Sequence, residues 1–238
     1  MKVIVSDTPK ELGITAARIA AEYLNGLISK KGYARIVVST GSSQFETFEA
    51  LIASDIDWSK VEMFHLDEYA GLPESHPASF RKYLKERFVS KVNLLAVNFV
   101  DGNPGSIQAL SRKLLEKPVD LGLIGIGENG HIAFNDPPAD FETKDAYILV
   151  NLSDTCKKQQ VGEGWFADVD EVPKQAVSMS VHQIMQCGKI ISCVPHAVKA
   201  KAVADTMNND LTNLVPATVL KSHSDWTLLL DKASAALF

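Results

Sequence analysis

Short apolar runs alternate with amphipathic stretches along the whole chain, and this alternation constrains the fold more than any other feature. The apolar runs are rich in β-branched residues and too short for buried helices, so they predict strands. These runs lie at residues 35–39, 61–66, 97–101, 121–125, 147–151, 190–194 and 227–230. Helical patterns cover residues 9–30, 43–53, 79–88, 106–115, 181–186 and 197–208. This order predicts an α/β fold with a doubly wound, mostly parallel sheet and helices on both faces.

The size and charge of the chain narrow its class further. We expect residues 1–238 to form a single domain, because no segment rich in Pro, Gly or Ser divides them. The net charge of −5 argues against a nucleic-acid partner, which needs a positive surface. No apolar run approaches the roughly 20 residues of a membrane span, and no signal-peptide pattern follows Lys2. Cys156, Cys187 and Cys193 form no metal-ligand pattern, so we expect buried thiols in a cytoplasmic protein.

The loop at residues 39–44, with the sequence STGSSQ, follows a predicted strand and opens a predicted helix. Small residues allow close approach of the backbone to a ligand, and the N–H groups of a helix N-terminus attract anions. The loop lacks both the Lys of a Walker A motif and the spacing of a dinucleotide fingerprint. Gly41, Ser42 and Ser43 are therefore candidates to hold a phosphate, the alternative being an ordinary Ser-capped helix start.

Two adjacent carboxylates, Asp67 and Glu68, stand where the predicted strand 61–66 ends. Neighbouring side chains of an extended chain point to opposite faces, so we expect only one of them to face a given site. A carboxylate at this edge is suited to act as a general base. The alternative is a pair of acidic residues on a solvated loop.

The segment at residues 125–137, GIGENGHIAFNDP, is the most informative loop. Three glycines precede His131 directly after an all-apolar strand, which predicts a loop at the carboxyl edge of the sheet. Histidine carries protons near neutral pH, and Asp136 is near enough in sequence to orient it. Lys199 opposes the dipole of its predicted helix, a cost that a bound anion would explain. The alternative for Lys199 is a solvated surface position.

Several segments together resemble the glucosamine-6-phosphate deaminase/isomerase family. They are residues 66–69, 125–137, 172–176, 199–202 and 216–220, and the matches keep the family's order from about residue 36 to residue 231. The resemblance implies a Rossmann-like sheet without a nucleotide, cofactor or metal. It also implies a small-molecule sugar phosphate as the partner, with glucosamine 6-phosphate converted to fructose 6-phosphate and ammonia.

The resemblance assigns roles to individual residues. By position, Asp67 is the base that moves a proton between C2 and C1, and His131 is the acid/base that opens the sugar ring. Asn129 and Asp136 support His131 in this catalytic set. The substrate-binding residues implied in the same way are Gly41, Ser42, Ser43, Glu68, Gly125 and Lys199. Opening a ring near neutral pH suits a His beside a carboxylate.

The chain departs from the family's pattern at three places around the substrate. Gln44 stands where the family commonly has Pro, and Asp136 stands where Glu is usual. A phosphate-binding Arg is expected after residue 155, but the chain has only Lys157 and Lys158 there. These changes surround the sugar and the phosphate, so galactosamine 6-phosphate remains an alternative substrate.

Two other functions fit part of the pattern. The 6-phosphogluconolactonases share this fold but usually read TASLFP after their Gly-His pair, whereas residues 132–137 read IAFNDP. Hydrolysis of a lactone also needs no carbon-acid base at Asp67. A sugar-phosphate sensor is the other alternative, motivated by Asp136 and the missing Arg, although binding alone requires neither Asp67 nor His131. The sequence leaves a homo-oligomer open.

Overall fold

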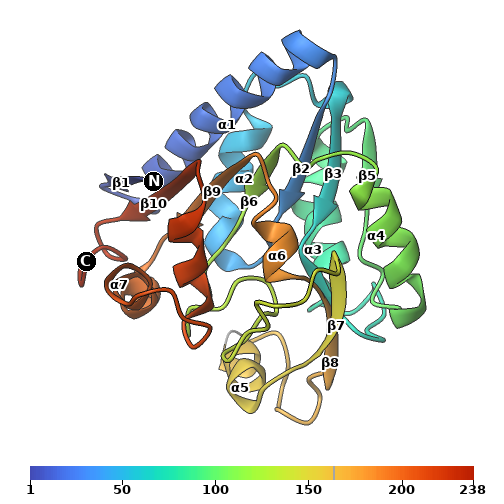
Figure 1. Cartoon of the computed structure of the whole chain (residues 1–238), viewed down its shortest axis with the longest axis vertical. Coiled ribbons are helices and arrows are strands. Elements are labelled where there is room, and N and C mark those ends of the chain that lie inside the picture. The colour runs from blue at the N-terminus through green and yellow to red at the C-terminus, as the bar shows by residue number, and fades with distance from the viewer. Residues whose placement is uncertain (163) are drawn as a thin grey trace.

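The computed structural model describes residues 1–162 and 164–238, and a seven-stranded sheet forms its centre (Figure 1). The strand order is β1-β10-β9-β6-β2-β3-β5, and every neighbouring pair is parallel. In chain order these strands are β1 (Lys2–Ser6), β2 (Ala34–Val38), β3 (Val61–His65), β5 (Ala96–Asn98), β6 (Leu121–Leu123), β9 (Lys189–Val194) and β10 (Trp226–Asp231). The predicted doubly wound, mostly parallel α/β fold is thus confirmed.

Helices follow most strands, as the alternation in the sequence predicts. They are α1 (Pro9–Lys31), α2 (Phe45–Ile52), α3 (Phe80–Arg87), α4 (Ile107–Leu115), α5 (Asp154–Gly162), α6 (Val181–Ile184) and α7 (Ala200–Asn208). The longest, α1, begins where the Thr8 side chain accepts a hydrogen bond from the Glu11 N–H. It ends at Gly32, whose φ of 81° is a left-handed conformation that glycine adopts without strain.

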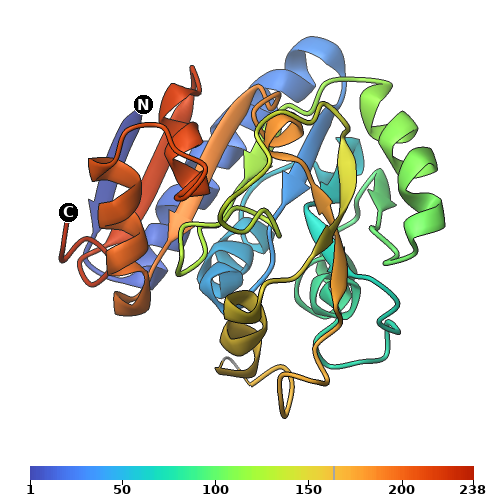
Figure 2. The same ribbon diagram turned by 60° about the horizontal axis from the view of Figure 1, so that its bottom comes forward.

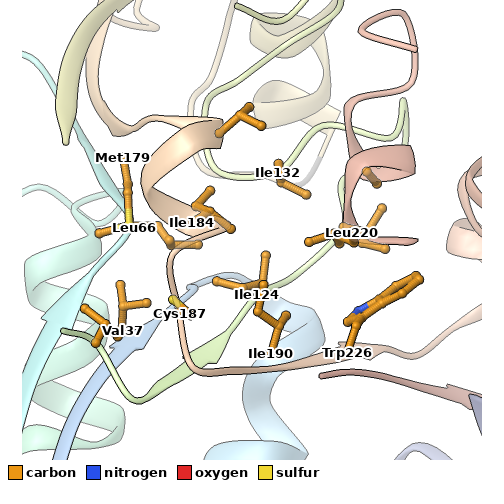
Figure 3. Close-up of a cluster of buried hydrophobic side chains, with 14 of the residues drawn as sticks. Val37, Leu66, Ile124, Ile132, Met179, Ile184, Cys187, Ile190, Leu220 and Trp226 are labelled. Carbon is orange, nitrogen blue, oxygen red and sulfur yellow. The ribbon is translucent and has the colours of Figure 1, made fainter. Parts of the chain in front are cut away.

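Two apolar clusters cover the opposite faces of the central sheet, and side chains that alternate along a strand enter one cluster or the other. In β2, Ile36 and Val38 pack against a cluster that includes residues of α1, α2 and α3. Val37, between them, packs into a second cluster that includes residues of α4, α6 and α7 (Figure 3). Full burial of one such side chain stabilises the fold by about 1.5–3 kcal/mol. This explains why the strands read as continuous apolar runs.

A second, three-stranded sheet of order β4-β8-β7 covers the carboxyl end of β3, and all its pairs are antiparallel. It consists of β4 (Asp67–Tyr69), β7 (Tyr147–Asn151) and β8 (Gln175–Met179). The predicted strand at 147–151 is therefore real but lies outside the parallel sheet. Neither β4 nor β8 was expected as a strand, since polar residues interrupt both.

Helix α5 was also absent from the prediction, because it has no apolar stripe and only Cys156 and Gln160 are buried among its residues. It lies beside the small sheet, at the end of the molecule that Figure 2 brings forward. All three cysteines are buried, as expected for small hydrophobic side chains. Across residues 1–162 and 164–238, no helix combines the length and apolar character that crossing a membrane requires.

Candidate active site

A cavity of about 210 Å³ lies where β2, β3, β6 and β9 end. Ligands bind at this edge in open α/β sheets, because the loops that follow the strands converge there. The predicted residues that line the cavity are Gly41, Ser42, Ser43, Asp67, Gly125, His131 and Lys199. The structure thus gathers seven candidates from four separate loops, while Glu68, Asn129 and Asp136 lie outside the lining.

The loop after β2 is held in place by bonds to three other elements. The Gly125 N–H donates to Ser39 Oγ at 3.1 Å. The Tyr83 hydroxyl of α3 donates to the Gly41 carbonyl at 2.8 Å. Gln44 Nε2 donates to the Cys193 carbonyl of β9 at 3.1 Å. Gln44, which departs from the family's pattern, therefore ties the loop to the sheet.

This loop lines the cavity and leads into a helix. Gly41 has a φ of 106°, which favours glycine, and a 3-10 turn at Ser42–Gln44 leads directly into α2. The N-terminus of a helix carries a partial positive charge and attracts anions. A loop that leads into a helix N-terminus is thus present where the sequence predicts one, and its binding of a phosphate stays a prediction.

Lys199 lies across the cavity, at the end of the 3-10 turn Ala197–Lys199 that precedes α7. Only 8% of Lys199 is exposed, so the alternative of a solvated surface lysine is wrong. His196 precedes the turn with a φ of 80°, and its N–H donates to the Asp231 carboxylate. His196 also lines the cavity, although its sequence context gave no signal for it.

Asp67 opens β4 and is 7% exposed, with its side chain on the cavity. Burial raises the pKa of its carboxyl well above the ordinary value, and the negative charge of Glu68 raises this pKa further. His65, the last residue of β3, is fully buried, and its Nε2 accepts a hydrogen bond from the Val100 N–H at 2.8 Å. Burial, followed by the positive charge of Arg81, lowers the pKa of His65 to about 3. Asp67 is therefore the titratable group of this strand end that faces the cavity.

Glu68 points away from the cavity and is completely buried. Its carboxylate accepts hydrogen bonds from Ser79 Oγ at 2.8 Å and from the N–H groups of Phe80 and Arg81. It also pairs with Arg81 Nε at 3.0 Å. The structure thus places Glu68 at the start of α3 and not among the cavity residues, where the resemblance had put it. The opposite orientation of adjacent side chains in a strand is the physical reason.

His131 is fixed by Asn129 and Asp136. Asn129 Oδ1 lies 2.6 Å from His131 Nδ1 and also accepts the His131 backbone N–H at 3.1 Å. Asp136 Oδ1 lies 3.4 Å from the same ring nitrogen and accepts Asn129 Nδ2 at 3.2 Å. Asn129 and Asp136 therefore both lie against the same nitrogen of the imidazole, and their supporting role in catalysis stays a prediction. Their contacts favour the tautomer with a proton on Nδ1.

The glycines of this loop make room for the imidazole. A Cβ on Gly127 would lie 2.1–2.3 Å from three atoms of the His131 ring, so the ring packs directly on the Gly127 backbone. Gly130 has a φ of 81°, and a Cβ there would meet Val215 Cγ1 at 2.8 Å. Ile126 and Ile132 are buried in the core on either side of these glycines. The loop is consequently anchored by apolar side chains and shaped by the glycines.

One wall of the cavity comes from α5 and the residues after it, which the sequence did not single out. Gln159, Gln160 and Trp165 line the cavity there. The Tyr69 hydroxyl donates to Gln160 Oε1 at 2.6 Å and ties α5 to β4. Neither Lys157 nor Lys158 is among the described residues that line the cavity. An amide and an indole have no local sequence signature, so only the fold reveals this wall.

Known proteins share both the sequence and the fold of this chain. Residues 7–229 match the family described as glucosamine-6-phosphate isomerases/6-phosphogluconolactonase. A glucosamine-6-phosphate deaminase of Lactobacillus delbrueckii subsp. bulgaricus is 34% identical over 100% of this chain and 99% of its own length. One of Oenococcus oeni is 35% identical, with 84% of this chain and 85% of that protein covered.

Solved structures extend these similarities to the fold. A monomeric glucosamine-6-phosphate deaminase superposes with a TM-score of 0.89 and 28% identity, and the match covers 100% of both chains. A 6-phosphogluconolactonase from Shewanella baltica superposes with a TM-score of 0.80, covering 97% of each chain, at 19% identity. At that identity, the second similarity establishes a shared fold only.

Proposed function

Since the chain belongs to the family of glucosamine-6-phosphate isomerases and 6-phosphogluconolactonases, we propose that it converts glucosamine 6-phosphate and water to fructose 6-phosphate and ammonia. Relatives named glucosamine-6-phosphate deaminase match over its full length. The observation that carries the proposal is a single cavity lined by Asp67, by His131 and by an anion-binding loop. A carbon-acid base, a ring-opening acid/base and a phosphate site are the three parts that this reaction needs.

The phosphate binds between the loop after β2 and the turn before α7. Gly41, Ser42 and Ser43 supply backbone and hydroxyl donors at the start of α2, and Lys199 supplies a positive charge. These contacts are remote from C1 and C2, so they orient the sugar without taking part in proton transfer. This arrangement supports phosphate binding without the Arg expected after residue 155.

Ring opening comes first, because loss of ammonia requires a carbonyl at C1. A proton must leave the C1 hydroxyl, and another must reach the ring oxygen. With the Nδ1 proton of His131 directed at Asn129 Oδ1, the neutral ring has its basic nitrogen at Nε2. The Asp136 carboxylate, 3.4 Å from Nδ1, stabilises the imidazolium formed when Nε2 takes up a proton.

Asp67 then moves a proton from C2 to C1. The base must be ionised to accept the C2 proton, yet basic enough to remove one from carbon. Burial and the charge of Glu68 raise the pKa of Asp67 and strengthen it as a base. The resulting enolamine is protonated at C1 by the same carboxyl, and water replaces the amine to give the ketose and ammonia.

Ammonia release by the purified protein tests the proposal, with glucosamine 6-phosphate and galactosamine 6-phosphate run in parallel. We expect release from at least one of them and its loss in Asp67→Asn, which removes the base but keeps the shape. The preferred amino sugar identifies the epimer. Release of ammonia from neither sugar would refute the proposal.

6-Phosphogluconolactone is the third substrate in the same assay, because lactonases share this fold. The buried base Asp67 favours the deaminase, since lactone hydrolysis has no proton to move between carbons. Lactone hydrolysis without ammonia release would assign the chain to that branch of the family. Binding of all three compounds without turnover would instead identify a sensor.

A further inference from the structure

Ser153 makes two hydrogen bonds that join α5 to the residues behind His131. Its Oγ accepts the Cys156 N–H at 3.1 Å, which caps the first turn of α5. The same hydroxyl donates to Asp136 Oδ2 at 2.8 Å. A hydroxyl has one proton to donate and two lone pairs to accept with, so both bonds form together.

The two oxygens of Asp136 thus have different partners. Oδ2 accepts a hydrogen bond from the Ser153 hydroxyl. Oδ1 accepts one from Asn129 Nδ2 and lies 3.4 Å from His131 Nδ1. The carboxylate is largely removed from solvent, with 10% of its side chain exposed. A short aspartate side chain anchored at one oxygen holds the other in a fixed position. The orientation of the carboxylate behind the imidazole therefore depends on the start of α5.

We propose that Ser153 is a positioning residue that couples α5 to His131 through Asp136. This inference rests on the proposed function for its effect on turnover. The same helix supplies Gln159 and Gln160 to the cavity wall. One hydroxyl therefore links a helix that lines the cavity with the group that opens the sugar ring.

Two variants of Ser153 and one control test the role of its hydroxyl. Ser153→Gly removes the hydroxyl but keeps most of the helix start, because glycine is a tolerated N-cap residue. Ser153→Thr keeps a hydroxyl that can make both bonds. Thr8→Gly is the matched control, since Thr8 caps α1 in the same way and lies on a different helix.

Steady-state kinetics give the first readout. We expect Ser153→Gly to lower kcat by about tenfold, the effect of losing one charge-assisted hydrogen bond that orients a reacting group. KM should change by less than about twofold, because the phosphate site is untouched. Binding of an open-chain 2-amino-2-deoxyalditol 6-phosphate, which has no ring to open, should stay equally close to wild type. Ser153→Thr should restore kcat, and Thr8→Gly should leave it unchanged.

The NMR signals of the His131 imidazole provide a readout that does not require turnover. We expect them to shift in Ser153→Gly and in Asp136→Asn, and to stay at the wild-type position in Thr8→Gly. Wild-type imidazole signals and kcat in Ser153→Gly would overturn the inference and leave Ser153 a helix cap only. If the wild type releases no ammonia, the proposed function fails, and the imidazole signals alone decide on Ser153.

Discussion

Gly127→Ala gives the sharpest test of the cavity geometry. The added Cβ would lie 2.1 Å from His131 Cε1, whereas ordinary contact begins at 3.4 Å, so the ring and the Gly127 backbone must move apart by about 1 Å. It cannot swing away freely, because Asn129 holds Nδ1 at 2.6 Å. A displacement of about 1 Å in a reacting group costs about 100-fold in rate. We therefore expect kcat to fall about 100-fold, with overpacking lowering the free energy of unfolding by about 1–3 kcal/mol.

The assay is ammonia release from the preferred amino-sugar phosphate, with urea unfolding measured in parallel. KM should change little, because the three atoms nearest the added Cβ all belong to His131 and none to the phosphate loop. Gly26→Ala is the matched control, since Gly26 lies in α1 with nothing within 4 Å of an added Cβ. It should keep full kcat and gain about 0.5–1 kcal/mol of stability, as expected for Ala in an exposed helix. Wild-type kcat in a folded Gly127→Ala protein would refute the placement of His131.

Three further changes test the roles of the charged groups. Asp67→Asn should abolish turnover and raise the melting temperature at about pH 7. The pKa of Asp67 is raised above 3.8 in the folded state, so ionisation costs stability above that pH, and the gain should vanish below about pH 4. A higher melting temperature of Asp67→Asn that persists below about pH 4 would show that ionisation of Asp67 is not its cause. Lys199→Gln should raise KM about tenfold with kcat nearly unchanged, while Lys201→Gln, whose side chain is 76% exposed, should match wild type. Glu68→Gln should lower the free energy of unfolding by about 3 kcal/mol in urea, because it breaks a buried ion pair with Arg81. A raised KM without that loss would return Glu68 to the substrate-binding residues.

The parallel sheet was predictable because each of its main strands is buried on both faces. A strand such as β9 must then be mostly apolar, and four of its six residues are apolar: Ile190, Ile191, Cys193 and Val194. The strands of the small sheet were not predictable in this way, because they contain buried polar residues. Ser178 of β8 is completely buried, but its hydroxyl contacts the Phe134 N–H, so a polar residue serves there as a core residue. Such a role depends on residues distant in sequence, which no local pattern indicates.

The candidate site also has a part that the sequence predicts and a part that it does not. His131 and the loop after β2 carry local signals, since glycines and small residues cluster where a strand ends. Gln160 and Trp165 reach the cavity only because α5 folds over it, held by the bond from Tyr69 to Gln160. Helix α5 is polar on most of its surface, so periodicity does not reveal it. Contacts between residues distant in sequence position this part of the site: the hydrogen bond from Tyr69, and an apolar cluster in which Cys156 and Trp165 pack with Tyr69 and Phe134.

The adjacent carboxylates show how one short strand can serve two purposes. Alternation along β4 sends Asp67 to the cavity and Glu68 to the start of α3. Glu68 is held there by Arg81 and by backbone N–H groups, so its charge stands at a fixed place beside Asp67. That charge is the second cause, after burial, of the raised pKa of Asp67. The residue that accepts the first N–H groups of α3 therefore also tunes the proposed base, and its position next to Asp67 in β4 brings the two carboxyl groups close together.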